Sequence, residues 1–90
     1  MAAYKLATTT SFDRDYGKLC ADDKVLVDAV IDKLLAGQKL EPKHKDHPLK
    51  GRLKGLRDCH VKPDLLLIYE LDKNILILTA FRIASHSELF

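Results

Sequence analysis

Four histidines are the residues of this 90-residue chain with the clearest capacity for chemistry: His44, His47, His60 and His86. An imidazole has an ordinary pKa of about 6.5, so it accepts or donates a proton near neutral pH. Three of the four fall between residues 39 and 62, a segment with eight basic and three acidic side chains. Its net charge is +5, whereas the whole chain carries only +2. Concentrated positive charge of this kind is typical of phosphate binding, although a solvated charged loop would have the same composition.

Imidazoles beside many cations are the groups that cleavage of an RNA phosphodiester requires. The 2′-hydroxyl must lose a proton, the leaving 5′-oxygen must gain one, and the pentacoordinate phosphate carries extra negative charge. Histidine can serve either proton transfer, and Arg or Lys can stabilise the charge. The chain has no GxGxxG, GxxxxGK[ST], HExxH or paired CxxC motif. The sequence therefore contains none of the usual motifs for binding a nucleotide cofactor or for the common zinc enzymes.

Each of these residues also has a purely structural interpretation. His47 precedes Pro48 and can bond the backbone in a turn, and His60 can pair with Asp58 or Asp64. His86 can be a solvated side chain, Arg57 a buried ion-pair partner and Arg82 a surface charge. Periodicity does not decide whether these side chains converge in space.

Composition bounds the remaining possibilities. Ninety residues, 47% of them hydrophobic and 31% charged, are typical of one soluble globular domain over residues 1–90. Its thin stability margin favours a permanent partner. Two cysteines do not make a disulfide framework, no apolar signal core opens the chain, and no run reaches the roughly 20 residues of a membrane span. We expect a cytoplasmic protein that does not bind a membrane.

Apolar residues at helical spacing predict two amphipathic helices after a short strand near residues 4–8. In the first helix, Thr10 and Asp13 resemble a capping box, and the apolar face is Phe12, Tyr16, Leu19 and Cys20. In the second, Asp22 or Asp23 can cap the start and Gly37 marks the stop. Its apolar face is Val27, Val30, Ile31, Leu34 and Leu35.

The second half of the chain changes period and predicts strands. These are Leu53–Lys54, Arg57–Lys62, Leu65–Leu71 and Ile75–Phe81, separated by turns at Gly55, Pro63–Asp64 and Asp72–Asn74. Helices followed by strands joined through tight turns indicate an α+β fold. The expected architecture is an N-terminal strand and a two-helix hairpin packed on a twisted antiparallel sheet.

The run from KDHPLKG through GLRDCH, KPD and SHSELF resembles the YafQ-type toxins of the RelE superfamily. In these, a DHxLxG segment leads into GxRxxH, then KPD, a hydrophobic strand and a terminal GSHxxLF. FDRDYGKL also stands where the family has FxKDxxKL. Several linked motifs in the correct order are far more specific than any one of them.

The resemblance implies a RelE-like fold and an mRNA interferase, an endoribonuclease that acts on the ribosome and is held inactive by a cognate antitoxin. It implies cleavage without metal or other cofactor, leaving a 2′,3′-cyclic phosphate. The implied catalytic positions are His86, His60, Asp64 and His47, with His86 as the main proton-transfer group and His60 hydrogen-bonded to Asp64. The implied substrate contacts are Arg82 and Phe90, which would stack on a base; to these we add the basic residues Lys50, Arg52, Lys54 and Arg57.

Two positions depart from the pattern: Leu65 replaces a tryptophan, and Ala84 replaces the glycine before SH. Two other functions compete. ParE-like toxins share the fold and inhibit gyrase without cleaving RNA, although an inhibitor needs no convergent imidazoles. A metal-binding module could use His44, His47, Cys59 and His60, although the spacing is loose and the nearby cations oppose metal binding.

Overall fold

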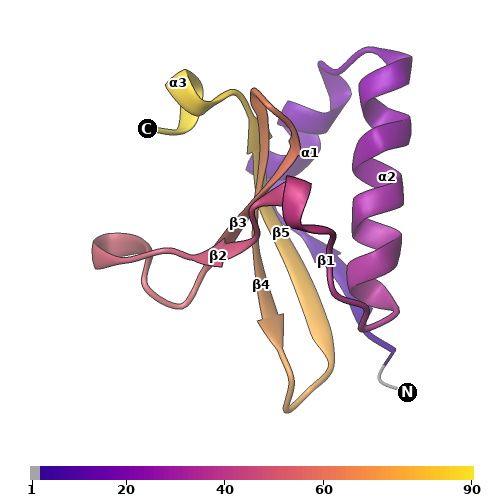
Figure 1. Cartoon of the computed structure of the whole chain (residues 1–90), viewed down its shortest axis with the longest axis vertical. Coiled ribbons are helices and arrows are strands. Elements are labelled where there is room, and N and C mark those ends of the chain that lie inside the picture. Colours follow the sequence, from indigo (N-terminus) through magenta and orange to yellow (C-terminus); the bar gives the residue numbers. More distant parts are fainter. Residues whose placement is uncertain (1–2) are drawn as a thin grey trace.

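Three apolar strands that follow one another along the chain form the centre of the sheet. They are β3 (Arg57–Lys62), β4 (Leu65–Asp72) and β5 (Ile77–Ala84), and each pairs antiparallel with the next. β2 (His47–Pro48) extends the sheet beside β3, and β1 (Lys5–Thr8) extends it beside β5, giving the order β1-β5-β4-β3-β2. The computed structural model describes residues 3–90 of the chain (Figure 1).

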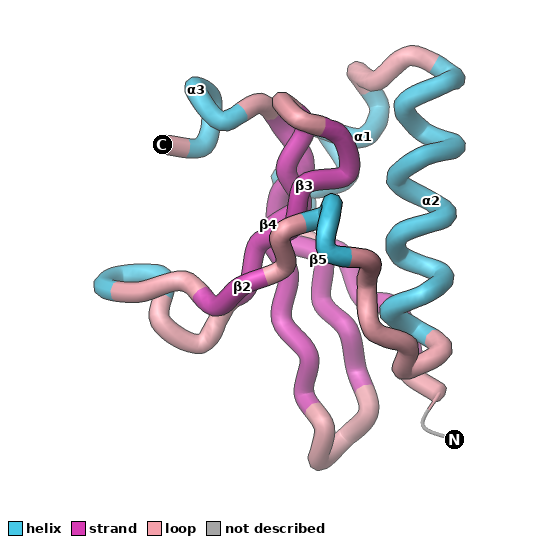
Figure 2. The backbone as a smooth tube through the Cα atoms, in the orientation of Figure 1, coloured by secondary structure: helices cyan, strands magenta, loops and turns pink. Residues whose placement is uncertain are grey.

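The predicted α+β class and the antiparallel pairing of the central strands are confirmed, and the N-terminal strand joins this sheet at one edge. β1 pairs with β5 in parallel, with Leu6 opposite Leu78. A tight turn would force neighbouring strands to run antiparallel, whereas β1 is connected through two helices and is free of that constraint. The same connection places both helices on one face of the sheet (Figure 2).

The helices are α1 (Thr10–Gly17) and α2 (Ala21–Leu35), and their apolar faces pack on the sheet. The predicted apolar face of α2 is confirmed, with Val27, Val30, Ile31 and Leu34 buried and Leu35 half-buried. Of the apolar face predicted for the first helix, Phe12 is buried but Cys20 is exposed. The shared core lies between helices and sheet and includes Phe12, Val27, Cys59, Leu67, Tyr69 and Ile83. Among residues 3–90, no helix has the length and apolar character needed to cross a bilayer.

The predicted helix caps are wrong by one residue in α1 and by two or three residues in α2. Thr9, not Thr10, caps α1: its hydroxyl accepts from the Phe12 amide (3.0 Å) and donates to the Phe81 carbonyl (2.8 Å). The bond to Phe81 of β5 favours Thr9 over Thr10 as the cap. The local sequence gives no sign of this, because Phe81 lies far along the chain. α2 begins after Cys20, which makes no side-chain cap, so Asp22 and Asp23 lie in the first turn instead. There they still favour the positive end of the helix dipole.

The predicted strand at Leu53–Lys54 is wrong. That segment belongs to a loop that extends away from the sheet and contains a short 3₁₀ helix, η2 (Gly51–Leu53) (Figure 2). Gly51 (φ 69°) and Gly55 (φ 98°) both adopt left-handed backbone, which interrupts an extended strand. The last strand begins two residues later than predicted because Ile75 and Leu76 remain in the turn, and it continues to Ala84. The other two predicted strands are confirmed, with β4 one residue longer.

Candidate active site

The two faces of β3 carry different chemistry. Cys59 and Val61 point into the core beneath the helices. Because side chains alternate along a strand, Asp58 and His60 lie on the opposite face. β2 pairs with β3 so that His47 is directly opposite Asp58. The sheet therefore places an aspartate and two histidines from separate segments on one face.

His47 has its ring held by the backbone. Its Nδ1 lies 2.7 Å from the Lys45 carbonyl oxygen, and since a carbonyl only accepts, this nitrogen carries the proton in the neutral ring. Lys45 adopts left-handed backbone (φ 47°), which turns its carbonyl toward the imidazole. The exposed His47 ring is thus left with Nε2 as its free proton acceptor.

Asp58 is a buried carboxylate beside this imidazole. Its Oδ1 lies 3.2 Å from His47 Nδ1, yet it accepts no hydrogen bond from any group in residues 3–90, because that nitrogen is directed at Lys45. The contact is therefore electrostatic. Burial raises the pKa of Asp58 above its ordinary value, while the nearby charges of His47, His60 and His86 act to lower it. Three histidines thus lie within electrostatic reach of one carboxylate that is only 3% exposed.

His60 is held in the same way as His47. Its Nδ1 is 3.3 Å from the Pro63 carbonyl oxygen, which leaves Nε2 as the acceptor of the neutral ring. The backbone of His60 is fixed in turn by His44, whose Nδ1 donates to the His60 carbonyl at 2.7 Å. His44 is 8% exposed and lies in the 3₁₀ helix η1 (Pro42–His44). We therefore interpret His44 as a structural residue that supports His60.

The segment carrying His47 is attached to the sheet through its neighbour Asp46. The Asp46 carboxylate accepts from the Tyr69 hydroxyl at 2.5 Å and from Arg57 Nε at 3.2 Å. Tyr69 is fully buried, and burial together with Asp46 raises the pKa of its phenol, so it remains a hydrogen-bond donor. This buried donor fixes Asp46 and thereby the adjoining His47.

His86 begins the single-turn helix α3 (His86–Leu89). A helix this short is unstable alone, so its ends must be supported. Ser85 and Glu88 form a capping box in which the Ser85 amide donates to Glu88 at 3.1 Å and the Glu88 amide to the Ser85 hydroxyl at 3.4 Å. Asp64 accepts from the backbone amide of His86 at 3.2 Å. Phe90 lies beside the His86 ring, with centroids 5.2 Å apart, and is 54% exposed.

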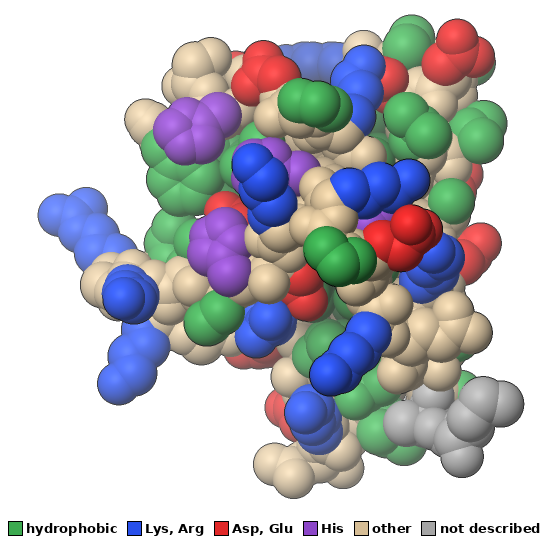
Figure 3. All heavy atoms as spheres, in the orientation of Figure 1, with side chains coloured by type: hydrophobic (Ala, Val, Ile, Leu, Met, Phe, Trp, Pro, Cys, Tyr) green, Lys and Arg blue, Asp and Glu red, His purple; other side chains and the backbone are tan. Residues whose placement is uncertain are grey.

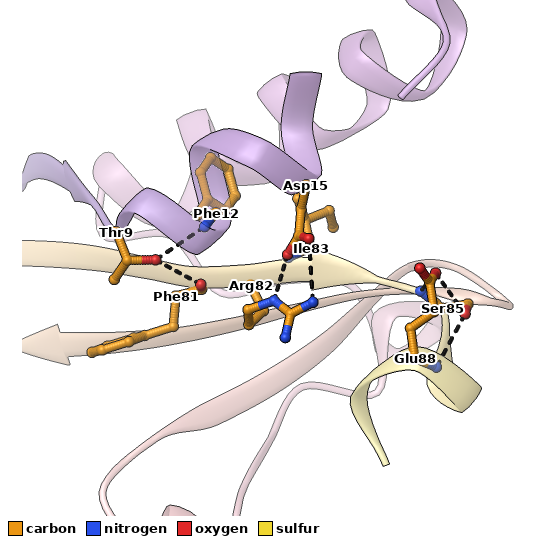
Figure 4. A network of polar contacts seen from close by, with 8 residues as sticks. All are labelled: Thr9, Phe12, Asp15, Phe81, Arg82, Ile83, Ser85 and Glu88. Carbon is orange, nitrogen blue, oxygen red and sulfur yellow. Dashed lines mark hydrogen bonds and ion pairs between the residues drawn. The ribbon is translucent and has the colours of Figure 1, made fainter. Parts of the chain in front are cut away.

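The predicted basic residues fall into two groups. Lys50, Arg52 and Lys54 are exposed on the loop that extends beyond β2, beside the face on which histidines gather (Figure 3). Arg57 and Arg82, in contrast, are bound by carboxylates of their own chain. Arg57 pairs with Asp46, and Arg82 Nε lies 2.6 Å from Asp15 Oδ2 (Figure 4).

The structure differs from the sequence interpretation at two site residues. His60 and Asp64 do not form the expected hydrogen bond, because the His60 ring faces the Pro63 carbonyl and Asp64 holds the His86 amide. From the sequence, Asp58 is expected only as a structural partner for His60, whereas in the structure it lies buried beside His47. An acidic residue two positions before His60 in a predicted strand was the available signal, since alternation puts both on one face.

The two departures from the family pattern also receive a structural explanation. Leu65 is 5% exposed, so its side chain offers no stacking surface to a substrate. Ala84 is the last residue of β5 and is not among the residues with positive φ. The backbone at this position therefore does not require glycine.

The alternative metal-ligand set is not assembled. Cys59 is fully buried on the helix-covered face, and burial raises the pKa of its thiol to about 12. His44 uses Nδ1 to hold the His60 carbonyl. Within residues 3–90, no group of three or more His, Cys, Asp or Glu side chains is arranged to hold a metal ion.

Comparisons with known proteins agree on one family. The family model for the bacterial toxin of type II toxin–antitoxin systems, YafQ, matches residues 4–90. The chain is 49% identical over 47 residues to mRNA interferase toxin YafQ of Escherichia coli K12, covering 52% of this chain and 49% of that protein. The alignment thus spans about half the length of this curated relative.

Solved structures extend the similarity over nearly the whole chain. A metal-bound toxin from Helicobacter pylori is 42% identical, with a TM-score of 0.82 and coverage of 97% of this chain and 99% of that one. YafQ in the E. coli DinJ–YafQ toxin–antitoxin complex is 30% identical, with a TM-score of 0.84 and 97% coverage of both chains.

Proposed function

The chain belongs to the YafQ family of bacterial type II toxins, and we propose that it is an endoribonuclease that cleaves messenger RNA in the ribosomal A site. The observation that carries this proposal is that His47 and His60 lie on the same face of the sheet as the buried carboxylate of Asp58. His47 and His60 each direct Nδ1 at a backbone carbonyl and leave Nε2 free, and His86 lies within electrostatic reach of the same carboxylate. We infer that these imidazoles act as the proton acceptor and the proton donor of the reaction.

Cleavage would proceed by attack of the substrate's own 2′-hydroxyl. A neutral imidazole takes the proton of that hydroxyl, and O2′ then forms a bond to phosphorus. The bond between phosphorus and O5′ breaks, and a protonated imidazole donates to O5′. The products are a 2′,3′-cyclic phosphate and a 5′-hydroxyl. We assign the main proton transfer to His86, with His60 and His47 completing the site, while Asp58 stabilises positive charge on the rings.

The proposed substrate contacts are one aromatic ring and several basic side chains. Phe90 is exposed beside His86 and can stack on a base, a contact worth about 1–3 kcal/mol at other aromatic platforms. Lys50, Arg52 and Lys54 can bind phosphates of the ribosome or the message. Arg82 and Arg57 keep donors beyond those bound to carboxylates. A protein that acts on translating ribosomes would work in the cytoplasm.

The reaction as written requires no metal ion, because the histidines perform both proton transfers and the cations stabilise the phosphate. We therefore expect cleavage to continue in the presence of EDTA. This expectation needs a direct test, because a related toxin from Helicobacter pylori has a metal-bound structure. Loss of cleavage with chelator and recovery with added metal would contradict this part of the proposal.

A cognate antitoxin is the proposed partner, since the related E. coli YafQ is bound by DinJ in a toxin–antitoxin complex. An antitoxin that binds only the folded toxin stabilises it by mass action, by about 4 kcal/mol at a thousandfold excess over Kd. Co-expression should restore growth of cells producing the toxin and should raise its melting temperature. A candidate antitoxin with neither effect is not the partner.

The proposed function is tested with purified chain and programmed ribosomes. We expect cutting of the message within the A-site codon and a 2′,3′-cyclic phosphate at the upstream fragment's end. His86→Gln serves as the matched control, because it keeps a polar side chain without a transferable proton. Growth arrest without any cleavage would contradict the proposal. Inhibition of gyrase supercoiling in the same preparation would then establish the ParE-like alternative.

A further inference from the structure

Asp15 of α1 is bound to the end of β5 by three hydrogen bonds. Arg82 donates to its carboxylate through Nε at 2.6 Å and through Nη2 at 3.2 Å, and the Ile83 amide donates at 3.2 Å. Figure 4 shows the carboxylate pointing from the helix toward these two residues of the strand. The contact joins parts of the chain that are 67 residues apart in sequence.

This contact is well defined because it is bidentate and largely shielded from water. A planar guanidinium that donates two bonds to one carboxylate fixes orientation as well as distance. The Asp15 side chain is only 13% exposed. Burial opposes its charged form, but the bonds from Arg82 and Ile83 outweigh burial and hold the pKa of Asp15 below its ordinary value. Asp15 is thus a carboxylate at neutral pH and remains bound to both donors.

The bound residues lie directly before the proposed catalytic histidine. β5 ends at Ala84, Ser85 caps α3, and His86 is the first residue of that helix. Only Ala84 and Ser85 lie between Ile83 and His86. On the other side, Asp64 binds the His86 amide at 3.2 Å. One carboxylate from α1 and one from the turn between β3 and β4 therefore hold the chain where it leaves the sheet and where α3 begins.

We propose that Asp15 is a positioning residue of the active site, which sets the place of the His86 imidazole by holding Arg82 and the Ile83 amide. The proposal rests on the proposed function of His86. It also assigns Arg82 a defined orientation: Nε and Nη2 are bound to Asp15, while Nη1 has no hydrogen-bond acceptor among residues 3–90. That amino group is free to bind a substrate phosphate.

The test compares Asp15→Asn with Asp13→Asn. Both changes neutralise a carboxylate of α1, but Asp13 is exposed and makes no side-chain hydrogen bond or ion pair within residues 3–90. Asp15→Asn is expected to slow single-turnover cleavage by about 10²-fold, the scale of a 1 Å misplacement of reacting groups. The half-saturating substrate concentration should change far less, because binding surfaces elsewhere remain. Asp13→Asn should cleave like the wild type.

A second measurement separates positioning from stability and does not require cleavage. The NMR signals of the His86 imidazole and amide should shift in Asp15→Asn and stay unchanged in Asp13→Asn, well below both melting temperatures. A variant with a lower melting temperature but wild-type His86 signals and wild-type rate would overturn the proposal. If the wild type cleaves nothing, the proposed function fails, while the His86 signals still decide the role of Asp15.

Asp15→Glu keeps the test decisive if Asp15→Asn does not fold. Glutamate retains the charge but is one methylene longer, so it cannot hold Arg82 and the Ile83 amide at the same place. We expect an intermediate cleavage rate and shifted His86 signals. Wild-type rate and wild-type signals in Asp15→Glu would show that only the charge matters, and would also overturn the proposal.

Discussion

The Asp58 carboxylate lies 3.2 Å from the His47 ring, but the ring nitrogen that faces it donates its proton to the Lys45 carbonyl. Oδ1 of Asp58 is therefore buried without a hydrogen-bond donor among the described residues. A buried carboxylate in this condition costs folding free energy, unlike the ion-paired Asp15. The cost is consistent with a functional role for the charge, because histidines that gain a proton during cleavage would be stabilised by it.

We predict that Asp58→Asn stabilises the protein at neutral pH and impairs cleavage. The pKa of Asp58 is raised in the folded chain. The free energy of unfolding is therefore largest below the pKa that Asp58 has in the unfolded chain, about 4. It falls as the pH rises through the higher pKa of the folded chain. Asparagine should add about 1–3 kcal/mol at pH 7, and this gain should vanish at low pH. Urea unfolding at both pH values measures the difference.

Cleavage by Asp58→Asn should fall on the order of 10²-fold, within the range that acid–base catalysis supplies. A variant that is less stable than the wild type at pH 7, or one that cleaves at the wild-type rate, would contradict the role assigned to Asp58.

Removing the proton-transfer groups tests the histidines directly. His86→Gln should reduce single-turnover cleavage on programmed ribosomes by about 10²–10⁴-fold with ribosome binding nearly unchanged. His60→Gln should also lose activity. If the two residues act as a unit, the double variant should lose less than the product of the single losses. Full cleavage by His86→Gln would move the main proton transfer to His60 or His47.

The exposed basic loop should contribute to ribosome binding through phosphate contacts. Replacing Lys50, Arg52 and Lys54 together by glutamine should weaken binding and reduce its salt dependence. In a plot of log binding constant against log salt concentration, each lost phosphate contact makes the slope shallower by about 0.7–0.9, so the loss of three contacts makes it shallower by about 2 to 3. The control replaces Lys5, Arg14 and Lys73, which are exposed on other elements and change the net charge equally. Equal slopes for both triple variants in co-sedimentation would exclude the loop from the interface.

The buried Tyr69, which binds the residue before His47, is expected to contribute to both stability and activity. Tyr69→Phe removes the hydroxyl that donates to Asp46 at 2.5 Å. A lost hydrogen bond to a charged group should lower the free energy of unfolding by about 1.5–3 kcal/mol. Cleavage measured well below the melting temperature should also fall, because Asp46 adjoins His47. Lower stability with unchanged cleavage would show that Asp46 does not position His47.

The sequence by itself determined the α+β class, the apolar face of α2 and the central strands, because burial imposes a period of 3.6 or 2 that a sequence displays locally. Its linked motifs also indicate His47, His60 and His86 as catalytic residues, and these roles remain predictions. Only the tertiary structure placed β1 parallel to β5, selected Thr9 as the cap, and brought Asp58 and Asp15 to the site. These features rest on contacts between distant segments, such as the bond between Asp15 and Arg82, which are 67 positions apart in sequence. Periodicity reports which face of an element is buried, whereas the partner that meets each side chain is decided by how the elements pack.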